Sequence, residues 1–250
     1  MLHFVERGRG PAIVFVHAFP MDHSMWETQI NLFSERWRVV APDVIGFGGS
    51  TPARPWTMED MGRELLALFD HLKIDRCTLA GLSMGGYISL QFTAEHPERV
   101  ERLILAHSRV RADNDAEKKA RSDMIAAIRQ GGVETLPERM LPRLLAANAP
   151  ADVREKVRQK ILSTDPQAAA FAVEAMRNRK DASGLPNRIS CPALILAGDQ
   201  DVILTVEDCC SVADSFPKGQ LAVIPNAGHL SNVENPEAFN AAVLQFLEST

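Results

Sequence analysis

The segment Gly81-Leu82-Ser83-Met84-Gly85-Gly86 places a serine between two glycines at the spacing Gly-x-Ser-x-Gly. It follows the apolar run 77–80 and opens a stretch with the composition of a helix. A serine on a sharp turn from strand to helix projects its hydroxyl at the strand end, where it can act as a nucleophile. Side chains two residues before and after it would collide across that turn, which explains the flanking glycines. We therefore predict that Ser83 is a nucleophile.

A serine hydroxyl is a weak nucleophile near neutral pH and needs a neighbouring base. His229 follows the last predicted strand and is the candidate base. A carboxylate must orient that histidine, and both Asp199 and Asp201 follow the preceding predicted strand. We favour Asp201, because the chain needs room to leave the strand before a carboxylate can face His229. Asp199 is then expected to bond the backbone of its own turn.

The negative oxygen that forms when a serine attacks a carbonyl needs two hydrogen-bond donors. One expected donor is the backbone N–H of Met84. The other is the N–H of Phe19, in a loop after the first long strand where Pro20 favours an extended conformation of Phe19. We expect structural rather than chemical roles for His17 and Asp43, which lie near the same predicted edge.

Short apolar runs alternate with helical patterns along the chain. Strands are predicted at 2–6, 12–17, 37–41, 77–80, 103–106, 193–197 and 221–224, and helices at 58–71, 85–95, 206–215 and 236–248. The first two strands are expected to form an antiparallel hairpin. The later strands are apolar throughout, which is typical of parallel strands covered by helices on both faces. The alternation predicts an α/β protein with a mostly parallel, doubly wound sheet.

Residues 110–188 break this alternation, because they carry helical patterns near 116–129, 132–147, 152–162 and 166–179 and no strand pattern. The interval is far longer than a single connecting helix. We predict that it is a helical cap over Ser83, inserted into an α/β core formed by residues 1–109 and 189–250. Ile203 and Leu230 are weaker candidates for the apolar lining of the substrate pocket below this cap.

The composition fits an ordinary folded protein, with 46% hydrophobic and 24% charged residues and a net charge of −5. That charge argues against nucleic acid and anionic membranes as partners, and a run of the roughly 20 apolar residues that span a bilayer is missing. The four cysteines lack zinc-site spacing. The N-terminus lacks a signal-peptide pattern. We expect a cytoplasmic protein with a small-molecule substrate and no metal or cofactor, while the oligomeric state stays open.

Taken together, these motifs resemble those of the α/β-hydrolase superfamily over nearly the whole chain. The motifs are His17-Ala18-Phe19-Pro20, Asp43-x-x-Gly46-x-Gly48-x-Ser50, Gly81-Leu82-Ser83-Met84-Gly85-Gly86, Gly198-x-x-Asp201 and Gly228-His229. The resemblance implies that Ser83 is the nucleophile, Asp201 the acid and His229 the base. It also implies that Phe19 and Met84 supply the oxyanion-hole amides. The usual motif has glycine where this chain has Ala18. A serine at position 83 argues against the haloalkane dehalogenases and epoxide hydrolases of this fold, which use aspartate.

These observations predict a carboxylesterase or lactonase that cleaves small esters through an acyl-enzyme on Ser83. The segment 229–239 is similar to that of 3-oxoadipate enol-lactonases, and residues 83–86 with the loop 17–20 resemble cofactor-free haloperoxidases or perhydrolases. A C–C bond hydrolase and a non-catalytic ligand receptor of the same fold are further alternatives. An enol-lactone with a carboxylate would need a cationic pocket, and the candidate arginines are Arg109, Arg111, Arg121, Arg129, Arg139 and Arg143. The sequence does not say which of them face inward.

Overall fold

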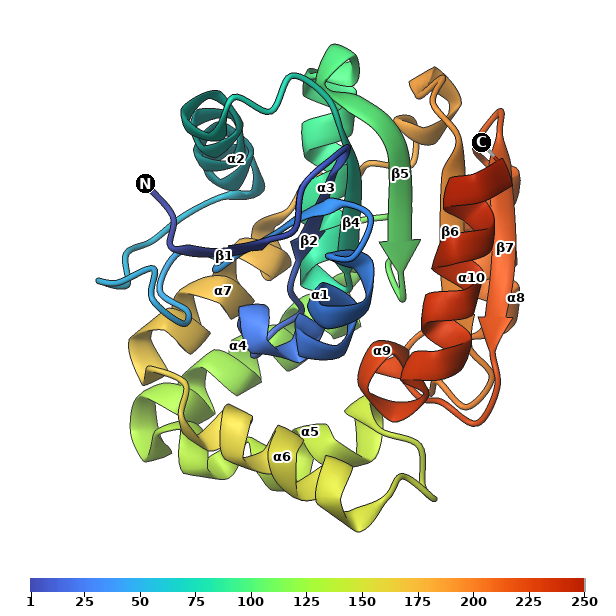
Figure 1. Ribbon diagram of the computed structural model, residues 1–250. Helices are drawn as coiled ribbons and strands as arrows, with labels where there is room; N and C mark the ends of the chain where they lie inside the picture. The colour runs from blue at the N-terminus through green and yellow to red at the C-terminus, as the bar shows by residue number, and fades with distance from the viewer. Residues whose placement is uncertain (250) are drawn as a thin grey trace.

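A seven-stranded sheet forms the centre of the protein, and its strand order is β1-β3-β2-β4-β5-β6-β7. The computed structural model describes residues 1–249 (Figure 1). The strands are β1 (Phe4–Arg7), β2 (Ala12–Val16), β3 (Arg38–Pro42), β4 (Cys77–Leu82), β5 (Val100–Ala106), β6 (Ala193–Gly198) and β7 (Gly219–Ile224). Every neighbouring pair is parallel except β1 with β3. The predicted, mostly parallel sheet is confirmed.

The predicted hairpin between the first two strands is wrong, because β3 lies between them. Val5 of β1 is opposite Ala41 in an antiparallel pairing, and Ile13 of β2 is opposite Val39 in a parallel one. Nearly all of β3 is buried, whereas β1 ends in two exposed charged residues. The apolar β3 therefore occupies an inner position, and the polar β1 occupies the sheet edge, where charged side chains are tolerated.

Helices cover both faces of the sheet, as predicted. They are α1 (Glu27–Phe33), α2 (Met58–Leu72), α3 (Met84–Glu95), α8 (Val206–Asp214), α9 (Ser231–Glu234) and α10 (Pro236–Ser249), with 3-10 turns η1 (His23–Trp26), η2 (Pro97–Arg99), η3 (Val133–Thr135) and η4 (Pro186–Arg188). In Figure 1, α1 and α10 lie in front of the sheet, and α3 and α8 lie behind it. Thr57 and Asp60 cap α2 by bonding each other's backbone amides.

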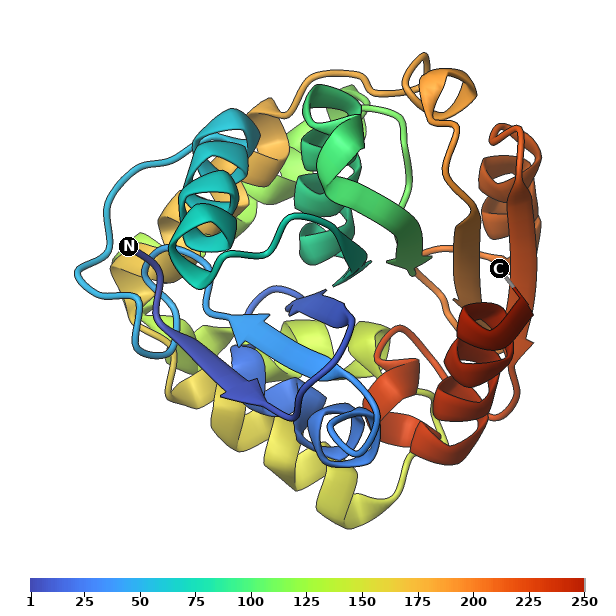
Figure 2. The ribbon, with the colours of Figure 1, turned by 45° about the horizontal axis from the view of Figure 1, so that its top comes forward.

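The segment 110–188 contains the helices α4 (Asp115–Gly131), α5 (Pro137–Leu144), α6 (Ala151–Leu162) and α7 (Pro166–Asn178). It leaves the sheet after β5 and returns at β6. Figures 1 and 2 show these helices gathered at the carboxyl ends of the strands, where the arrowheads of β5 and β7 point. Ligand sites of open parallel sheets lie at this edge. Within residues 1–249, every helix is too short or too polar to cross a bilayer.

Candidate active site

Ser83 lies on a tight turn between β4 and α3, with φ 53° and ψ −110°. A positive φ is uncommon for a residue with a side chain and is held only by surrounding contacts. A Cβ atom at Gly81 would lie 2.2 Å from the carbonyl oxygen of Gly85, and one at Gly85 would lie 2.1 Å from that of Val16. Both glycines are therefore required for the turn to pack against β2.

The structure brings Ser83, His229 and Asp201 into one hydrogen-bonded chain. The Oγ atom of Ser83 lies 2.9 Å from Nε2 of His229, and Nδ1 of His229 lies 2.7 Å from Oδ2 of Asp201. The three residues follow β4, β7 and β6, whose carboxyl ends meet at one edge of the sheet. His229 and Asp201 are buried, so the hydrogen bonds between them are shielded from water.

Of the two candidate acids, Asp201 contacts His229 and Asp199 does not. The second oxygen of Asp201, Oδ1, accepts hydrogen bonds from the amides of Ile203 at 2.7 Å and Leu204 at 3.2 Å. Asp199 instead accepts the Ala227 amide at 3.2 Å and holds the two neighbouring loops together. These bonds leave Oδ2 of Asp201 free to face the histidine.

A second histidine, which the sequence analysis missed, contacts the same carboxylate. Nδ1 of His107 lies 2.8 Å from Oδ2 of Asp201, and its Nε2 lies 2.6 Å from Oγ of Ser231. Burial lowers the pKa of His107, so its imidazole stays neutral. Burial alone would raise the pKa of Asp201, but attraction to His229 and the hydrogen bonds from both histidines hold that pKa below its ordinary value. The signal in the sequence was the position of His107, directly after a predicted strand.

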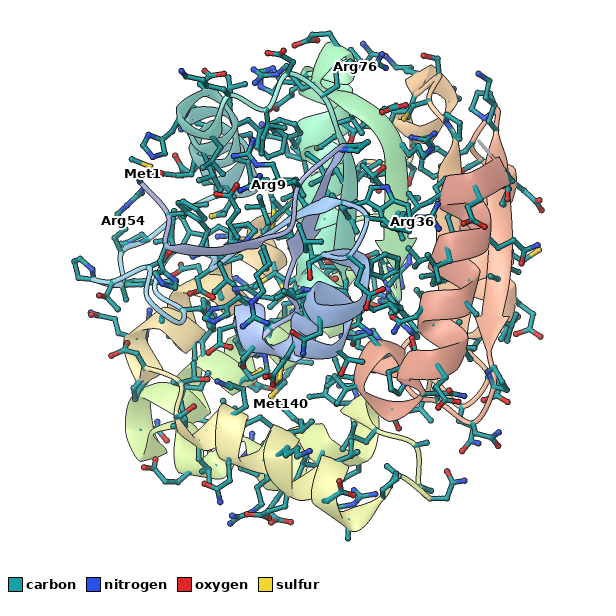
Figure 3. All side chains as sticks on the ribbon, viewed as in Figure 1. Met1, Arg9, Arg36, Arg54, Arg76 and Met140 are labelled. Carbon is teal, nitrogen blue, oxygen red and sulfur yellow. The ribbon has the colours of Figure 1, made fainter. Side chains whose placement is uncertain are left out.

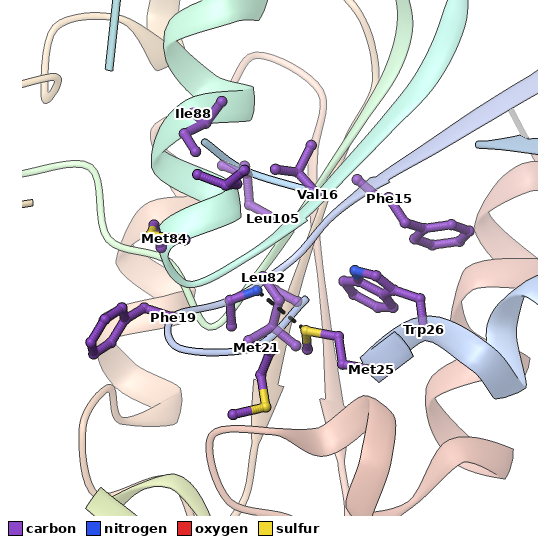
Figure 4. Close-up of a cluster of buried hydrophobic side chains, with 14 of the residues drawn as sticks. Phe15, Val16, Phe19, Met21, Met25, Trp26, Leu82, Met84, Ile88 and Leu105 are labelled. Atoms are coloured by element: carbon purple, nitrogen blue, oxygen red, sulfur yellow. Dashed lines mark hydrogen bonds between the residues drawn. The ribbon is translucent and has the colours of Figure 1, made fainter. Parts of the chain in front are cut away.

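The backbone N–H groups of Phe19 and Met84 donate to no protein group within residues 1–249. Met84 is the first residue of α3, where the N–H has no partner inside its helix. Phe19 lies in the loop after β2, which is held by the bond from the Ala18 amide to the sulfur of Met25 at 3.2 Å, drawn as a dashed line in Figure 4. Both amides therefore have no hydrogen-bond partner among the described residues.

The structural roles expected for His17 and Asp43 are confirmed. Nε2 of His17 accepts the Val44 amide at 2.9 Å, and its Nδ1–H donates to the carbonyl of Ala18 at 2.9 Å. Asp43 accepts the backbone amides of His23 at 2.8 Å and Gly49 at 2.9 Å. These contacts tie the loop after β3 to the loop after β2.

Among residues 1–249, two sets of side chains offer metal-ligating atoms within 4.8 Å of one another. They are His3, His23 and Asp43, and His107, Asp201 and His229. In both sets each imidazole Nδ1 lies 2.6 to 2.8 Å from a carboxylate oxygen. Those distances are hydrogen-bond distances, and hydrogen bonding accounts for the arrangement of both sets.

Ser83 and His229 open into a cavity of about 290 Å³ between the sheet edge and the segment 110–188. Phe19, Ile203 and Met140 contribute apolar lining. Figure 3 labels Met140 between the helices of this segment and the sheet. Leu230 is not among the lining residues: it is fully buried in the core, and its amide bonds the backbone of the segment. The expectation of a pocket position for Leu230 is therefore wrong.

The cavity lining is cationic. Arg109, Arg121, Arg139 and Arg143 line it together with the acids Asp113 and Glu117. Glu117 pairs with Arg109 and Arg111, and Asp113 pairs with Arg121 and Arg179. The hydrogen bond from Arg111 lowers the pKa of Glu117 to about 2. Glu117 therefore stays ionised, and arginines already present pair with both acids.

Arg139 and Arg143 take no part in these ion pairs. They lie four residues apart on α5, so they occupy one face of that helix. Both are exposed, and neither forms an ion pair with any of residues 1–249. Of the six arginines considered from the sequence, Arg111 and Arg129 lie outside the cavity lining. The structure thus provides two unpaired positive charges at the cavity.

A sequence model of the alpha/beta hydrolase fold family matches residues 11–236. The match covers most of the chain and agrees with the sheet order and the turn at Ser83. The protein belongs to the α/β-hydrolase fold family, which confirms the expected fold.

Particular relatives within this family are hydrolases. The chain is 31% identical to 3-oxoadipate enol-lactonase 2 of Acinetobacter baylyi, over 93% of this chain and 87% of that protein. A malate-bound thermophilic esterase from Thermogutta terrifontis is 37% identical, with a TM-score of 0.95 over 99% of this chain and 93% of that one. The enol-lactonase from Burkholderia xenovorans LB400 is 29% identical, with a TM-score of 0.89 over 99% and 96%. These similarities support hydrolase activity.

Proposed function

We propose that this protein is a serine hydrolase that cleaves small carboxylic esters or lactones through an acyl-enzyme on Ser83. The observation that carries the proposal is the hydrogen-bonded chain from Ser83 through His229 to Asp201, with Ser83 and His229 lining one cavity. A serine activated in this way attacks acyl groups in unrelated folds, because the histidine removes the proton of the hydroxyl and the carboxylate orients the histidine.

In the proposed first step, Oγ of Ser83 attacks the acyl carbon while Nε2 of His229 takes its proton. Asp201 keeps the hydrogen of His229 on Nδ1 and stabilises the imidazolium that forms. The carbonyl oxygen becomes an oxyanion and accepts hydrogen bonds from the free amides of Phe19 and Met84. Donors that are already in place cost no reorganisation when the charge develops.

In the second step, the tetrahedral intermediate collapses and the bond to the leaving oxygen breaks. Nε2–H of His229 donates its proton to that oxygen, which leaves as an alcohol. In a lactone the alcohol stays attached to the acyl chain. His229 then takes a proton from water as the water oxygen attacks the acyl-enzyme. The bond to Oγ of Ser83 breaks, His229 returns the proton to Oγ, and the carboxylic acid is released.

We propose further that the substrate carries a carboxylate beside its ester or lactone group. Arg139 and Arg143 lie at the cavity without acidic partners among residues 1–249, and an arginine guanidinium binds carboxylates through paired N–H groups. The esterase from Thermogutta terrifontis has malate, a dicarboxylate, bound in its structure, and the relative from Acinetobacter baylyi is named for the enol-lactone of 3-oxoadipate, also a dicarboxylate. Enol-lactone hydrolysis is therefore the specific second candidate. In this proposal the segment 110–188 acts as the cap that selects the substrate.

The test compares esters that differ in charge but little in length, such as monomethyl succinate and methyl pentanoate, together with 3-oxoadipate enol-lactone. We expect the anionic ester to be hydrolysed with the higher kcat/KM, and the activity to disappear in Ser83→Ala. A clear preference for the enol-lactone over both esters would select the second candidate. Equal or better turnover of methyl pentanoate would contradict the proposed carboxylate.

A further inference from the structure

The carboxylate of Asp201 lies between two imidazoles that contact the same oxygen. Oδ2 is 2.7 Å from Nδ1 of His229 and 2.8 Å from Nδ1 of His107, and the two rings meet edge to face with centroids 5.3 Å apart. Each ring then contacts a serine hydroxyl through Nε2, at 2.9 Å for Ser83 and 2.6 Å for Ser231. The result is a chain of five side chains, nearly symmetric about Asp201.

The two ends of this chain differ in access. Ser83 lines the cavity, whereas Ser231 has 0% of its surface exposed and His107 only 1%. A substrate can reach Ser83 but not Ser231. The arm formed by His107 and Ser231 is therefore not a second reaction centre, and its hydrogen bond to the catalytic chain is the one to Asp201.

The hydrogen-bond partners of His107 determine which of its ring nitrogens carries the hydrogen. An ionised carboxylate accepts hydrogen bonds only, so Nδ1 of His107 must carry the hydrogen that faces Asp201. Nε2 of the neutral ring then holds a lone pair, which accepts the hydroxyl hydrogen of Ser231. Asp201 thus selects the tautomer of His107, and Ser231 completes the hydrogen bonding at the other ring nitrogen and holds the orientation of the ring. Neither His107 nor Ser231 lines the cavity.

The backbone at His107 is held in an uncommon conformation, with φ 50°. A residue with a side chain adopts this left-handed region at a free-energy cost, which its contacts must offset. The backbone of His107 is anchored by its amide, which donates to the carbonyl of Leu196 at 2.9 Å. The next residue, Ser108, donates its hydroxyl to the carbonyl of Ser83 at 2.6 Å. This short segment after β5 thus contacts both the nucleophile turn and the carboxylate.

We infer that His107 is a positioning residue for Asp201, with Ser231 holding the orientation of its ring. Oδ1 of Asp201 is held by the amides of Ile203 and Leu204, and the Nδ1–H of His107 holds Oδ2. The carboxylate therefore cannot rotate away from His229 during proton transfer. This inference rests on the proposed function, because it assigns His107 an effect on the reactivity of Ser83.

The test uses two substitutions at position 107 and one at position 231. His107→Asn keeps an N–H donor near the place of Nδ1 and tolerates a positive φ, since asparagine is enriched in that region. His107→Ala removes the donor. Ser231→Ala keeps the imidazole but removes the hydroxyl that holds its Nε2. The readouts are kcat and KM with an ester, and the rate at which a fluorophosphonate probe labels Ser83.

We expect His107→Ala to lower kcat and the labelling rate by about tenfold to a hundredfold with little change in KM, since a misplaced acid affects the transition state. His107→Asn should recover most of the loss, and Ser231→Ala should fall between the two. A merely structural role would lower stability without this recovery pattern. Wild-type rates in His107→Ala, or equal losses in the alanine and asparagine variants at matched melting temperature, would overturn the inference.

A proton NMR measurement keeps the inference testable if His107→Ala does not fold. The wild-type protein and Ser83→Ala should show the same number of downfield imidazole N–H resonances at neutral pH, and His107→Asn should lack one of them. An unchanged number in His107→Asn would refute the arrangement around Asp201. Failure of the proposed function gives a different result, because wild-type Ser83 would then not react with the fluorophosphonate at all.

Discussion

Glu234 hydrogen-bonds the amide of Ala146, with its Oε1 2.7 Å from that nitrogen. Its other oxygen, Oε2, accepts the amide of Gly228 at 2.8 Å. One carboxylate therefore joins the loop that carries His229 to the segment that carries Arg139 and Arg143. The amide of Leu230 adds a second link, because it donates to the carbonyl of Leu144 at 3.1 Å.

Replacing Glu234 with alanine should loosen both sides of this link. Two part-buried amides lose a charged acceptor, which corresponds to about 1–3 kcal/mol of unfolding free energy. We expect a lower urea midpoint, and a higher KM for an anionic ester because α5 is less well held. Glu237→Ala is the matched control, since Glu237 is exposed on the neighbouring helix. Equal midpoints for the two variants would show that the link contributes nothing.

Removing the hydroxyl of Ser83 should abolish ester hydrolysis while leaving the fold intact. Ser83→Ala removes the nucleophile but leaves the free amides and the cavity, so a fall in kcat of about 10⁴-fold or more is expected. Steady-state kinetics and a thermal melt measure the two quantities. Ser211→Ala, at an exposed position on α8, serves as the control. Substantial activity in Ser83→Ala would assign the chemistry to another group.

Neutralising the unpaired arginines should change the preference for substrate charge. Arg139→Gln and Arg143→Gln each remove a guanidinium at the cavity. We expect KM for monomethyl succinate to rise about tenfold, roughly 1.4 kcal/mol, with little change for methyl pentanoate. Arg129→Gln is the control, because Arg129 lies on α4 outside the cavity lining. The loss should shrink at high salt, which screens exposed charges. Parallel changes for both esters would argue against a carboxylate site.

Two buried histidines should make stability fall as the solution is acidified. Burial lowers the pKa of both His17 and His107 below the ordinary value of 6.5. Below that pH the unfolded chain takes up protons that the native protein does not, so stability is present at higher pH and is lost as pH falls. The limiting slope is about 1.4 kcal/mol per pH unit for each histidine. Urea unfolding between pH 7.5 and 5.5 measures it.

His107→Asn provides the control for this pH dependence, because it removes one of the two titrating groups. The slope between pH 6.5 and 5.5 should fall by about half. An unchanged slope in His107→Asn would mean that His107 takes up protons equally in the native and unfolded states.

The carboxylate of Asp22 affects stability only at lower pH. Burial alone would raise its pKa, but hydrogen bonds from Lys160 and Ser24 lower that pKa to about 2, so its contribution to stability is lost only below its ordinary value of 3.8.

The parts of the fold that depend on residues close together in the sequence could be predicted from the sequence. The spacing of Gly81, Ser83 and Gly85 predicts a strand-to-helix turn, because the clash that excludes a side chain at Gly81 is with Gly85, four residues away. The capping of α2 and the apolar periodicity of the helices are equally local. The position of Asp201 after β6 and of His229 after β7 follows from a further rule, that parallel strands end at one edge.

Only the tertiary structure decided the contacts between distant segments. β1 pairs with β3 rather than β2 because the buried faces of the whole sheet determine strand order, and a short polar strand fits its edge. His107 meets Asp201 across 94 residues of sequence because β5 and β6 are neighbours in the sheet. Arg139 and Arg143 line the cavity because α5 is anchored beside the loop of His229. The sequence by itself determined the α/β fold and the serine, aspartate and histidine that follow its strands. The structure determined their partners, because long-range packing is a property of the assembled core.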